Sequence, residues 1–256
     1  MLGFCPWPLS LSPKAHRREF AMTNNIRLPS FHSAGWPFIG LFAGITILLF
    51  FVSDTAFFIG LVLTAWCFYF FRDPERVTPS RSGLIVSPAD GRVIAIQDVV
   101  PEAEFNLGNK PLTRISIFLN VFDVHVNRIP ADGSVIARRY RPGKFVNASL
   151  DKASVDNERM ALTIQLEGDH PRKGEKIGVV QIAGLIARRI VCDAQEGQRV
   201  KAGEHFGLIR FGSRTDIYLP QGVQPLVCIG QRTIGGETVL ADILSTESPR
   251  KGEVRL

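Results

Sequence analysis

The sequence predicts a mostly β protein of the sandwich type, preceded by an N-terminal hydrophobic helical hairpin. Three observations carry this prediction. A single long apolar stretch lies near the N-terminus, short β-branched runs separated by Gly, Pro, Asp and Asn follow it, and no amphipathic helical pattern separates those runs. The 256 residues are 45% hydrophobic and 21% charged, with 23 Gly and 16 Pro, which excludes a disordered, collagen-like or coiled-coil chain.

The apolar stretch covers residues 36–71, and Asp54 is its single formally charged residue. Its halves, 36–52 and 55–71, have 17 residues each. That length is roughly 25 Å of helix, against a hydrocarbon core of about 30 Å. We therefore expect a membrane helical hairpin at 36–71, with its turn at Asp54. A hairpin that dips into one leaflet without crossing it stays open, as does the core hairpin of a soluble protein.

Basic residues flank the hairpin on both sides, at Arg17, Arg18, Arg27, Arg72 and Arg76. By the positive-inside rule, both flanks then lie at the cytoplasmic face of the cell membrane. The first 21 residues of the N-terminal segment 1–35 contain neither the compact apolar run nor the cleavage site of a signal peptide. We expect this segment to be disordered or interfacial, with Met22 as an alternative start. The four cysteines are scattered and form no CxxC, as is typical of a reducing compartment.

Residues 72–256 are expected to form the β-rich domain. Its strand-like runs lie at 91–97, 113–127, 159–167, 176–183, 188–192, 204–210, 216–218 and 237–243. The net charge of +6 and the pI near 9.4 favour an anionic partner, such as phospholipid or nucleic acid. Because no aromatic-basic surface motif accompanies this charge, nucleic acid is the less favoured of the two.

The run at 113–127 carries a polar triplet near its end: Asp123, His125 and Asn127. In one continuous strand these side chains share a face, and apolar side chains project from the other. A polar face on an otherwise apolar strand is costly unless it is solvated or used. His125 is therefore a candidate base, with a hydrogen-bonded structural histidine as the alternative.

A Gly-Ser step at Gly212 and Ser213 interrupts a second strand-like run. Glycine leaves the carbonyl group of Gly212 open to a nucleophile, and Ser213 carries the nearest hydroxyl. Asp90 belongs to an Asp-Gly pair at the start of a third run. An ordinary turn is the alternative interpretation of both places.

Four motifs in this order, together with the hairpin, resemble the short-form phosphatidylserine decarboxylase proenzymes. They are Phe-Phe-Arg-Asp-Pro-Glu-Arg at 70–76, Ser-Pro-Ala-Asp-Gly at 87–91, Phe-Asp-Val-His-Val-Asn-Arg at 122–128 and Phe-Gly-Ser-Arg-Thr-Asp at 211–216. Each motif alone is weakly specific, whereas the ordered set is specific. The resemblance covers nearly all of the chain from about Gly35 onward.

The resemblance implies an enzyme that makes its own pyruvoyl cofactor from Ser213. Ser213 Oγ attacks the carbonyl of Gly212, and β-elimination cuts the chain into a β chain, residues 1–212, and an α chain, residues 213–256. The pyruvoyl group then forms a Schiff base with phosphatidylserine and withdraws electrons as CO₂ departs, which yields phosphatidylethanolamine. No metal is implied. The implied partners are phosphatidylserine, anionic membrane lipid and the two chains of one proenzyme.

The family pattern also implies a triad for maturation, in which Asp90 orients His125 and His125 deprotonates Ser213. His125 is the implied acid that protonates the substrate carbon as well. Longer-form members carry a second histidine where Arg128 stands, and arginine is no base near neutral pH. Arg128 and Asn127 are candidate substrate-binding residues. Candidates for headgroup contact, with solvated surface charge as the alternative, are Arg138, Arg139, Arg141, Lys144, Arg188 and Arg189.

A membrane-anchored carrier or binding module without enzymatic activity is the competing interpretation. Residues 196–209 resemble part of a lipoyl or biotinyl carrier domain, and a lipoyl-like β architecture is compatible with a catalytic domain too. A carrier needs a lysine at a hairpin tip between hydrophobic or methionine residues, and the sequence has none there. The sequence leaves the oligomeric state open, a homo-oligomer included, as it does the acyl-chain preference.

Overall fold

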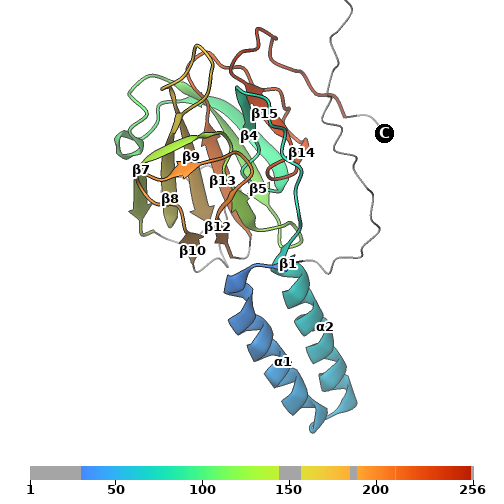
Figure 1. Cartoon of the computed structure of the whole chain (residues 1–256). Coiled ribbons are helices and arrows are strands. Elements are labelled where there is room, and N and C mark those ends of the chain that lie inside the picture. The colour runs from blue at the N-terminus through green and yellow to red at the C-terminus, as the bar shows by residue number, and fades with distance from the viewer. Residues whose placement is uncertain (1–29, 144–156, 185–188, 211, 255–256) are drawn as a thin grey trace, which may run out of the picture.

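In the computed structural model, an antiparallel pair of helices projects from a β-rich body (Figure 1). The structure describes residues 30–143, 157–184, 189–210 and 212–254. The predicted mostly β fold with a helical hairpin before it is confirmed. The expectations for residues 1–29, Lys144 and Arg188 lie outside the described residues.

The helical hairpin consists of α1 (Trp36–Phe50) and α2 (Asp54–Phe70). Its turn lies where the sequence predicts it. The Ser53 hydroxyl caps α2 by accepting a hydrogen bond from the Ala56 N–H at 3.1 Å. Asp54 occupies the first turn of α2, where a negative charge is favourable beside the positive end of the helix dipole.

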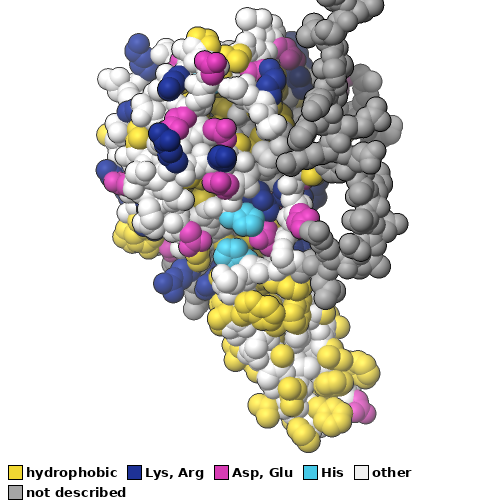
Figure 2. Space-filling view, in the orientation of Figure 1, with side chains coloured by type: hydrophobic (Ala, Val, Ile, Leu, Met, Phe, Trp, Pro, Cys, Tyr) yellow, Lys and Arg dark blue, Asp and Glu magenta, His cyan; other side chains and the backbone are white. Residues whose placement is uncertain are grey.

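The outer surface of the hairpin is apolar (Figure 2). Side chains more than half exposed include Leu41, Ile47, Leu48, Phe58, Ile59 and Val62. This exposure contradicts the alternative of a hairpin buried in the core of the body. The segment Ser33–Phe50 is long and apolar enough to cross a membrane, and Asp54–Phe70 is a shorter apolar helix. Between them and the body, β1 (Ser30–Phe31) pairs antiparallel with β2 (Arg72–Asp73) and closes the base of the hairpin.

One eight-stranded antiparallel sheet forms most of the body. Its strands, in spatial order, are β11 (Arg199–Val200), β7 (Gly133–Arg141), β8 (Arg159–Leu166), β9 (Lys176–Ala183), β13 (Ser213–Tyr218), β5 (Leu112–Leu119), β4 (Gly91–Val99) and β14 (Arg232–Thr233). The central place of β13, between β9 and β5, puts the start of this strand among well-paired neighbours.

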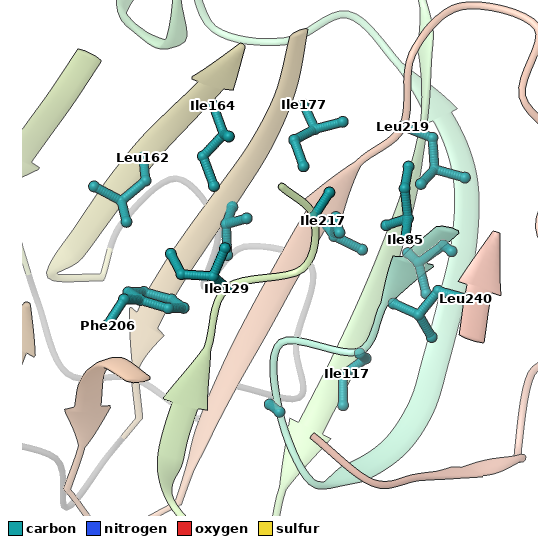
Figure 3. Close-up of a cluster of buried hydrophobic side chains, with 14 of the residues drawn as sticks. Ile85, Ile117, Ile129, Leu162, Ile164, Ile177, Phe206, Ile217, Leu219 and Leu240 are labelled. Carbon is teal, nitrogen blue, oxygen red and sulfur yellow. The ribbon is translucent and has the colours of Figure 1, made fainter. Parts of the chain in front are cut away.

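Two smaller sheets complete the body. One contains β10 (Ile190–Cys192), β12 (His205–Ile209) and β6 (Val126–Arg128), and the other contains β15 (Val239–Asp242) and β3 (Leu84–Val86). A short 3-10 helix, Ala103–Phe105, precedes β5. The main hydrophobic core joins the large sheet to both small ones. Figure 3 shows Leu162 and Ile217 of the large sheet in one cluster with Phe206 and Leu240 of the small sheets.

The three-stranded sheet β10–β12–β6 has a second apolar contact on its other side. Val124, Val126 and Leu208 form a cluster with the hairpin residues Phe70 and Phe71. This sheet therefore separates the main core from the base of the hairpin. Residues at its ends lie at the junction between the body and the helices.

The single strand predicted at 113–127 is wrong. The strand β5 ends at Leu119, a turn follows, and β6 begins at Val126 in a different sheet. Asn120 causes the break, because its side chain accepts a hydrogen bond from the Phe122 N–H at 2.8 Å, an Asx turn that competes with strand pairing. The predicted alternation holds only from Val124 onward: Val124 and Val126 pack against the hairpin, whereas Phe122 is exposed.

Candidate active site

Ser213 is the first residue of β13 and is fully buried. Its backbone pairs with Leu119 of β5 on one side and with Ala183 of β9 on the other. Because Ile217 of the same strand lies in the main core, the period of two places Ser213 on the inner face of the sheet. Among the described residues, Ser213 Oγ has no hydrogen-bond partner. A buried hydroxyl is thus held on a strand paired on both sides, and no described group engages it.

Gly212 connects Ser213 to the hairpin side of the body. Its φ of +65° is left-handed, which L side chains adopt at a cost, so a glycine is required here by conformation. Its N–H donates to His125 Nε2 at 3.3 Å. The structure therefore brings His125 to the Gly212–Ser213 step, 87 residues away along the chain, as the sequence predicts.

His125 is fully buried beneath the ring of Phe70, with the two ring centroids 4.3 Å apart. Its Nδ1–H donates to the backbone carbonyl of Asp123 at 2.9 Å. With Nδ1 as the donor and Nε2 as the acceptor, the hydrogen bonds assign a neutral imidazole. Burial lowers the pKa of His125 to about 4, assisted by the charge of Arg72 and opposed by the Asp123 carbonyl. His125 is therefore an unprotonated base at neutral pH.

The predicted hydrogen bond between Asp90 and His125 is not formed, because both ring nitrogens of His125 are engaged by other groups. The Asp90 carboxylate instead accepts from Arg76 at 2.8 Å and from the Gly235 N–H at 2.7 Å. Burial raises the pKa of Asp90, while these two hydrogen bonds oppose that rise. The turn after β5 explains the difference, because it presents the backbone carbonyl of Asp123 to His125 where a carboxylate was expected.

Arg128 and Asn127 are buried in β6 and bonded to the chain itself. Arg128 donates to the carbonyl groups of Gly203 and Pro74, each at 3.0 Å, and to the Asp73 carboxylate at 3.1 Å. These bonds tie the segment that leaves the hairpin to the body. Asn127 Oδ1 accepts from Gln181 Nε2 at 2.8 Å. Asn127 Nδ2 donates to the Pro88 carbonyl at 3.4 Å, so the printed contacts of both side chains hold the protein itself together.

Two residues that the sequence did not single out lie on the same inner face as Ser213. Thr215 and Gln181 pair directly across β13 and β9. Both are fully buried, and the structure gives no hydrogen-bond partner to Thr215 Oγ1 or Gln181 Oε1 within its described part. An unsatisfied buried polar atom costs about 1–3 kcal/mol, so three of them together on one face favour a polar group bound there. The sequence could have indicated Thr215, because it lies two residues after Ser213 and therefore on the same face of the strand. No feature of the sequence indicates that Gln181 lies there.

This polar face suits a pyruvoyl group at position 213. Such a group carries two carbonyl oxygens as acceptors, and the Thr215 hydroxyl is a donor aimed at the same face. No cluster of three or more His, Cys, Asp or Glu side chains that could hold a metal ion occurs among the described residues. The chemistry that the site offers is therefore that of a serine, a neutral histidine and neutral hydrogen-bonding groups.

The fold and the site define a class: a mostly β protein with an apolar hairpin, which holds a buried serine behind a left-handed glycine and beside a neutral histidine. The family profile of phosphatidylserine decarboxylase matches residues 63–241. The chain belongs to the phosphatidylserine decarboxylase family, which is the resemblance that its four motifs carry.

Similar proteins cover nearly the whole chain. It is 59% identical over 224 residues to the phosphatidylserine decarboxylase proenzyme of Cereibacter sphaeroides, a match that spans 88% of this chain and 94% of that protein. The protein of the same name from Paramagnetospirillum magneticum is 52% identical over 238 residues, 93% of this chain and 97% of the relative. The phosphatidylserine decarboxylase proenzyme of Ruegeria pomeroyi is 57% identical over 216 residues, which is 84% of this chain and 96% of that protein. These matches favour the enzyme over the carrier module.

Proposed function

We propose that this protein decarboxylates phosphatidylserine to phosphatidylethanolamine and CO₂, after cutting itself between Gly212 and Ser213. The products of the cut are a β chain, residues 1–212, and an α chain, residues 213–256. The name that the relatives share supports this reaction and the proenzyme state. The observation that carries it is the contact of His125 Nε2 with the Gly212 amide, next to a buried Ser213 Oγ that no described group engages.

Self-cleavage uses groups of this chain and, in its last step, one water molecule. Neutral His125 accepts the proton of Ser213 Oγ, and the oxygen attacks the Gly212 carbonyl, so that a C–O ester bond forms. His125 then returns the proton to the Ser213 nitrogen as the C–N bond breaks, which leaves a free amine at Ser213. Loss of the Ser213 α-proton then breaks the bond between Cβ and the ester oxygen and releases Gly212 as a carboxylate. Water hydrolyses the resulting dehydroalanine, and ammonia leaves. Gly212 places no side chain of its own beside the attacked carbonyl, and no atom lies within 4 Å of the point where its Cβ would be.

In the decarboxylation, a pyruvoyl group at position 213 supplies the carbonyl that takes up the electrons freed as CO₂ leaves. The Thr215 hydroxyl donates to a carbonyl oxygen of residue 213 and orients it, whereas Gln181 Oε1, an acceptor, is free to take a hydrogen bond from the amine of the substrate. Phe70 excludes water from the His125 ring. His125 carries a proton at Nε2 only transiently, because its pKa of about 4 makes the imidazolium a strong acid that gives this proton up readily.

We also propose that the hairpin lies in the cell membrane, with the body at its cytoplasmic face. The exposed apolar side chains of α1 and α2 support membrane insertion, and a diacyl lipid substrate requires access to the bilayer. Anionic lipid in that leaflet attracts a chain with a net charge of +6.

Intact mass under denaturing conditions tests the self-cleavage. We expect two fragments that divide after residue 212, with the α chain lighter than its serine form by about 17 Da for the exchange of an amine for a ketone. Ser213→Ala should give one uncut chain of 28.3 kDa. Ser116→Ala is the matched control, since Ser116 is an equally buried serine on the neighbouring strand β5 and its Oγ is likewise without a partner in the described part of the chain.

The outcome that overturns the proposal is an uncut wild-type chain recovered from native membranes, or cleavage that persists in Ser213→Ala. The decarboxylation itself is followed as phosphatidylethanolamine formed from phosphatidylserine vesicles. We expect it in the wild type and in Ser116→Ala and none in Ser213→Ala.

A further inference from the structure

Two arginines oppose each other at the end of a strand pair beside the active site. The β10–β12 ladder ends with Ile190 opposite Ile209. Arg189 and Arg210 are the next residues outward, just beyond the ends of the two strands, and continuation of the register would set them opposite each other on one face. Like charges in directly opposed positions destabilise a strand pair unless an anion lies between them.

No acidic partner offsets this pair within the described residues. Neither Arg189 nor Arg210 forms an ion pair or a side-chain hydrogen bond there, and Arg210 Nε is a buried donor left without an acceptor. Burial lowers the pKa of Arg210, and the nearby charge of Arg189 lowers it further. Other arginines of the body are neutralised: Arg139 pairs with Glu196, and Arg141 with Glu102.

The pair lies where the body meets the hairpin. Leu208, two residues before Arg210 and on the same strand face, packs in the cluster that contains the hairpin base. The Arg210 guanidinium stacks over the ring of Phe38 in the first turn of α1, 4.8 Å from its centroid. Figure 2 shows basic side chains on the body close to where the apolar hairpin begins. Arg210 is also three residues before Ser213, which is at most about 10 Å of extended chain.

We propose that Arg189 and Arg210 form the binding site for the phosphodiester group of the phosphatidylserine headgroup, an inference that rests on the proposed decarboxylation. Guanidinium groups bind phosphate oxygens through charge-assisted, bidentate hydrogen bonds. In phosphatidylserine, two carbon atoms separate the phosphodiester oxygen from the amine. If the two arginines bind the phosphodiester beside Phe38, the amine of the substrate can extend past Arg210 toward residue 213. The acyl chains then lie beside the hairpin.

Steady-state kinetics with soluble dihexanoyl phosphatidylserine test the site without a membrane. We expect Arg210→Gln and Arg189→Gln each to raise KM about tenfold and to change kcat less than about twofold, because a charged contact made equally in ground and transition states affects binding alone. Both variants should still cleave themselves. Arg199→Gln is the matched control, an arginine with an 85% exposed side chain on β11, and it should keep the wild-type KM.

A binding measurement that needs no catalysis accompanies the kinetics. Dihexanoyl phosphatidylethanolamine is titrated into the uncut Ser213→Ala protein and into the double variant Ser213→Ala, Arg210→Gln. We expect the double variant to bind the lipid with a Kd about tenfold higher. If this weakening is found and the wild type forms no phosphatidylethanolamine, the phosphodiester site stands and the proposed decarboxylation fails. If the wild type is active and neither KM nor Kd changes, the arginine site is overturned. An effect seen only with anionic vesicles, and absent with the soluble lipid, also overturns it, because the arginines then bind the leaflet.

Discussion

The hairpin and the β body distribute polarity in opposite ways. In the hairpin the large apolar side chains face outward, Ile47 and Val62 being 62% and 69% exposed, while the Thr46 hydroxyl is buried between the helices. In the body the apolar side chains are inside, and the buried charges Arg214 and Asp216 are held as a pair. Under the proposed membrane insertion, each arrangement suits its solvent, hydrocarbon for the hairpin and water for the body. The same substitution should therefore have different effects in the two regions.

Charges on the outer face of the hairpin should have the largest effect. The double variant Ile47→Lys with Val62→Lys places two lysines on exposed apolar positions. A lysine at the centre of a membrane helix costs about 2.5–3.5 kcal/mol, so the pair should weaken membrane insertion by roughly 5–7 kcal/mol. Flotation with liposomes measures this as a shift of the protein from the lipid layer to the soluble fraction.

The matched control puts the same two charges on the body. Val77→Lys with Ile229→Lys replaces side chains that are 73% and 63% exposed there. This variant should float with the lipid as the wild type does. Flotation of both variants to the same extent would contradict membrane insertion of the hairpin.

Removal of a buried charge in the body should have the next largest effect. Asp216 accepts hydrogen bonds from Arg214 Nε at 2.6 Å and Nη2 at 2.7 Å, and Arg114 Nε lies 3.8 Å from it. Asp216→Ala leaves these buried cations without their carboxylate, which should lower the free energy of unfolding by about 3–5 kcal/mol. The urea midpoint measures this loss.

Glu196→Gln supplies the comparison at the surface. The Arg139–Glu196 pair is equally short, at 2.6 Å, but both side chains are about half exposed. Its loss should change the free energy of unfolding far less than the loss of the buried pair does, because water and salt screen exposed charges. Equal midpoint shifts in Asp216→Ala and Glu196→Gln would refute the distinction between buried and exposed pairs.

The buried histidine should make stability depend on pH. The pKa of His125 is about 4 in the folded protein and 6.5 in the unfolded chain, so the unfolded chain takes up the proton first as the pH falls. The stabilisation is complete above pH 6.5 and is lost progressively toward pH 4. Between about pH 7.5 and pH 5 the loss should be roughly 2 kcal/mol. His125→Gln should remove this part of the pH dependence of the urea midpoint, measured in uncut Ser213→Ala protein; an unchanged slope would show that His125 is not buried as a neutral base.

The sequence was sufficient to predict the helical hairpin and the approach of His125 to Gly212 and Ser213, but not the partner of His125. Composition alone located the helices, because a stretch as long and apolar as residues 36–71, with a single charged residue, is typical of hydrophobic helices. The approach of His125 to Gly212 and Ser213 followed from the motifs. The partner of His125 was mispredicted because the Asx turn at Asn120 ends β5 early, and the turn competes with the β-branched pattern that predicted a longer strand.

Residues missed by sequence analysis depend on strand pairing between distant segments. Gln181 reaches the active site only because β9 lies beside β13, and it is 32 residues from Ser213 along the chain (213 − 181). Arg210 and Arg189 oppose each other only through the register of β10 and β12. Neither register is encoded by local periodicity, since a shift of one residue would reverse every side chain and still preserve the pattern.

The smallest expected effect is a threonine substitution made in both regions. In the hairpin, Thr46 Oγ1 donates to the Phe42 carbonyl at 2.8 Å and lies 3.0 Å from Thr64 Oγ1. In the body, the Thr163 hydroxyl, also buried, donates to the Phe105 carbonyl. Thr163→Val leaves that carbonyl without this donor and should cost about 1–2 kcal/mol in urea.

Thr46→Val should cost only about 0.6 kcal/mol, measured as the midpoint of unfolding by sodium dodecyl sulfate in mixed micelles. The Phe42 carbonyl keeps its hydrogen bond within α1, and Thr64 can turn its hydroxyl to a carbonyl of its own helix, so less is left unsatisfied than in the body. Thr55→Val, at an exposed position in α2, is the control for the change in helix propensity. A cost for Thr46→Val that equals or exceeds the cost for Thr163→Val would mean that the hairpin depends on its interior hydroxyl pair as strongly as the body depends on its buried polar contacts.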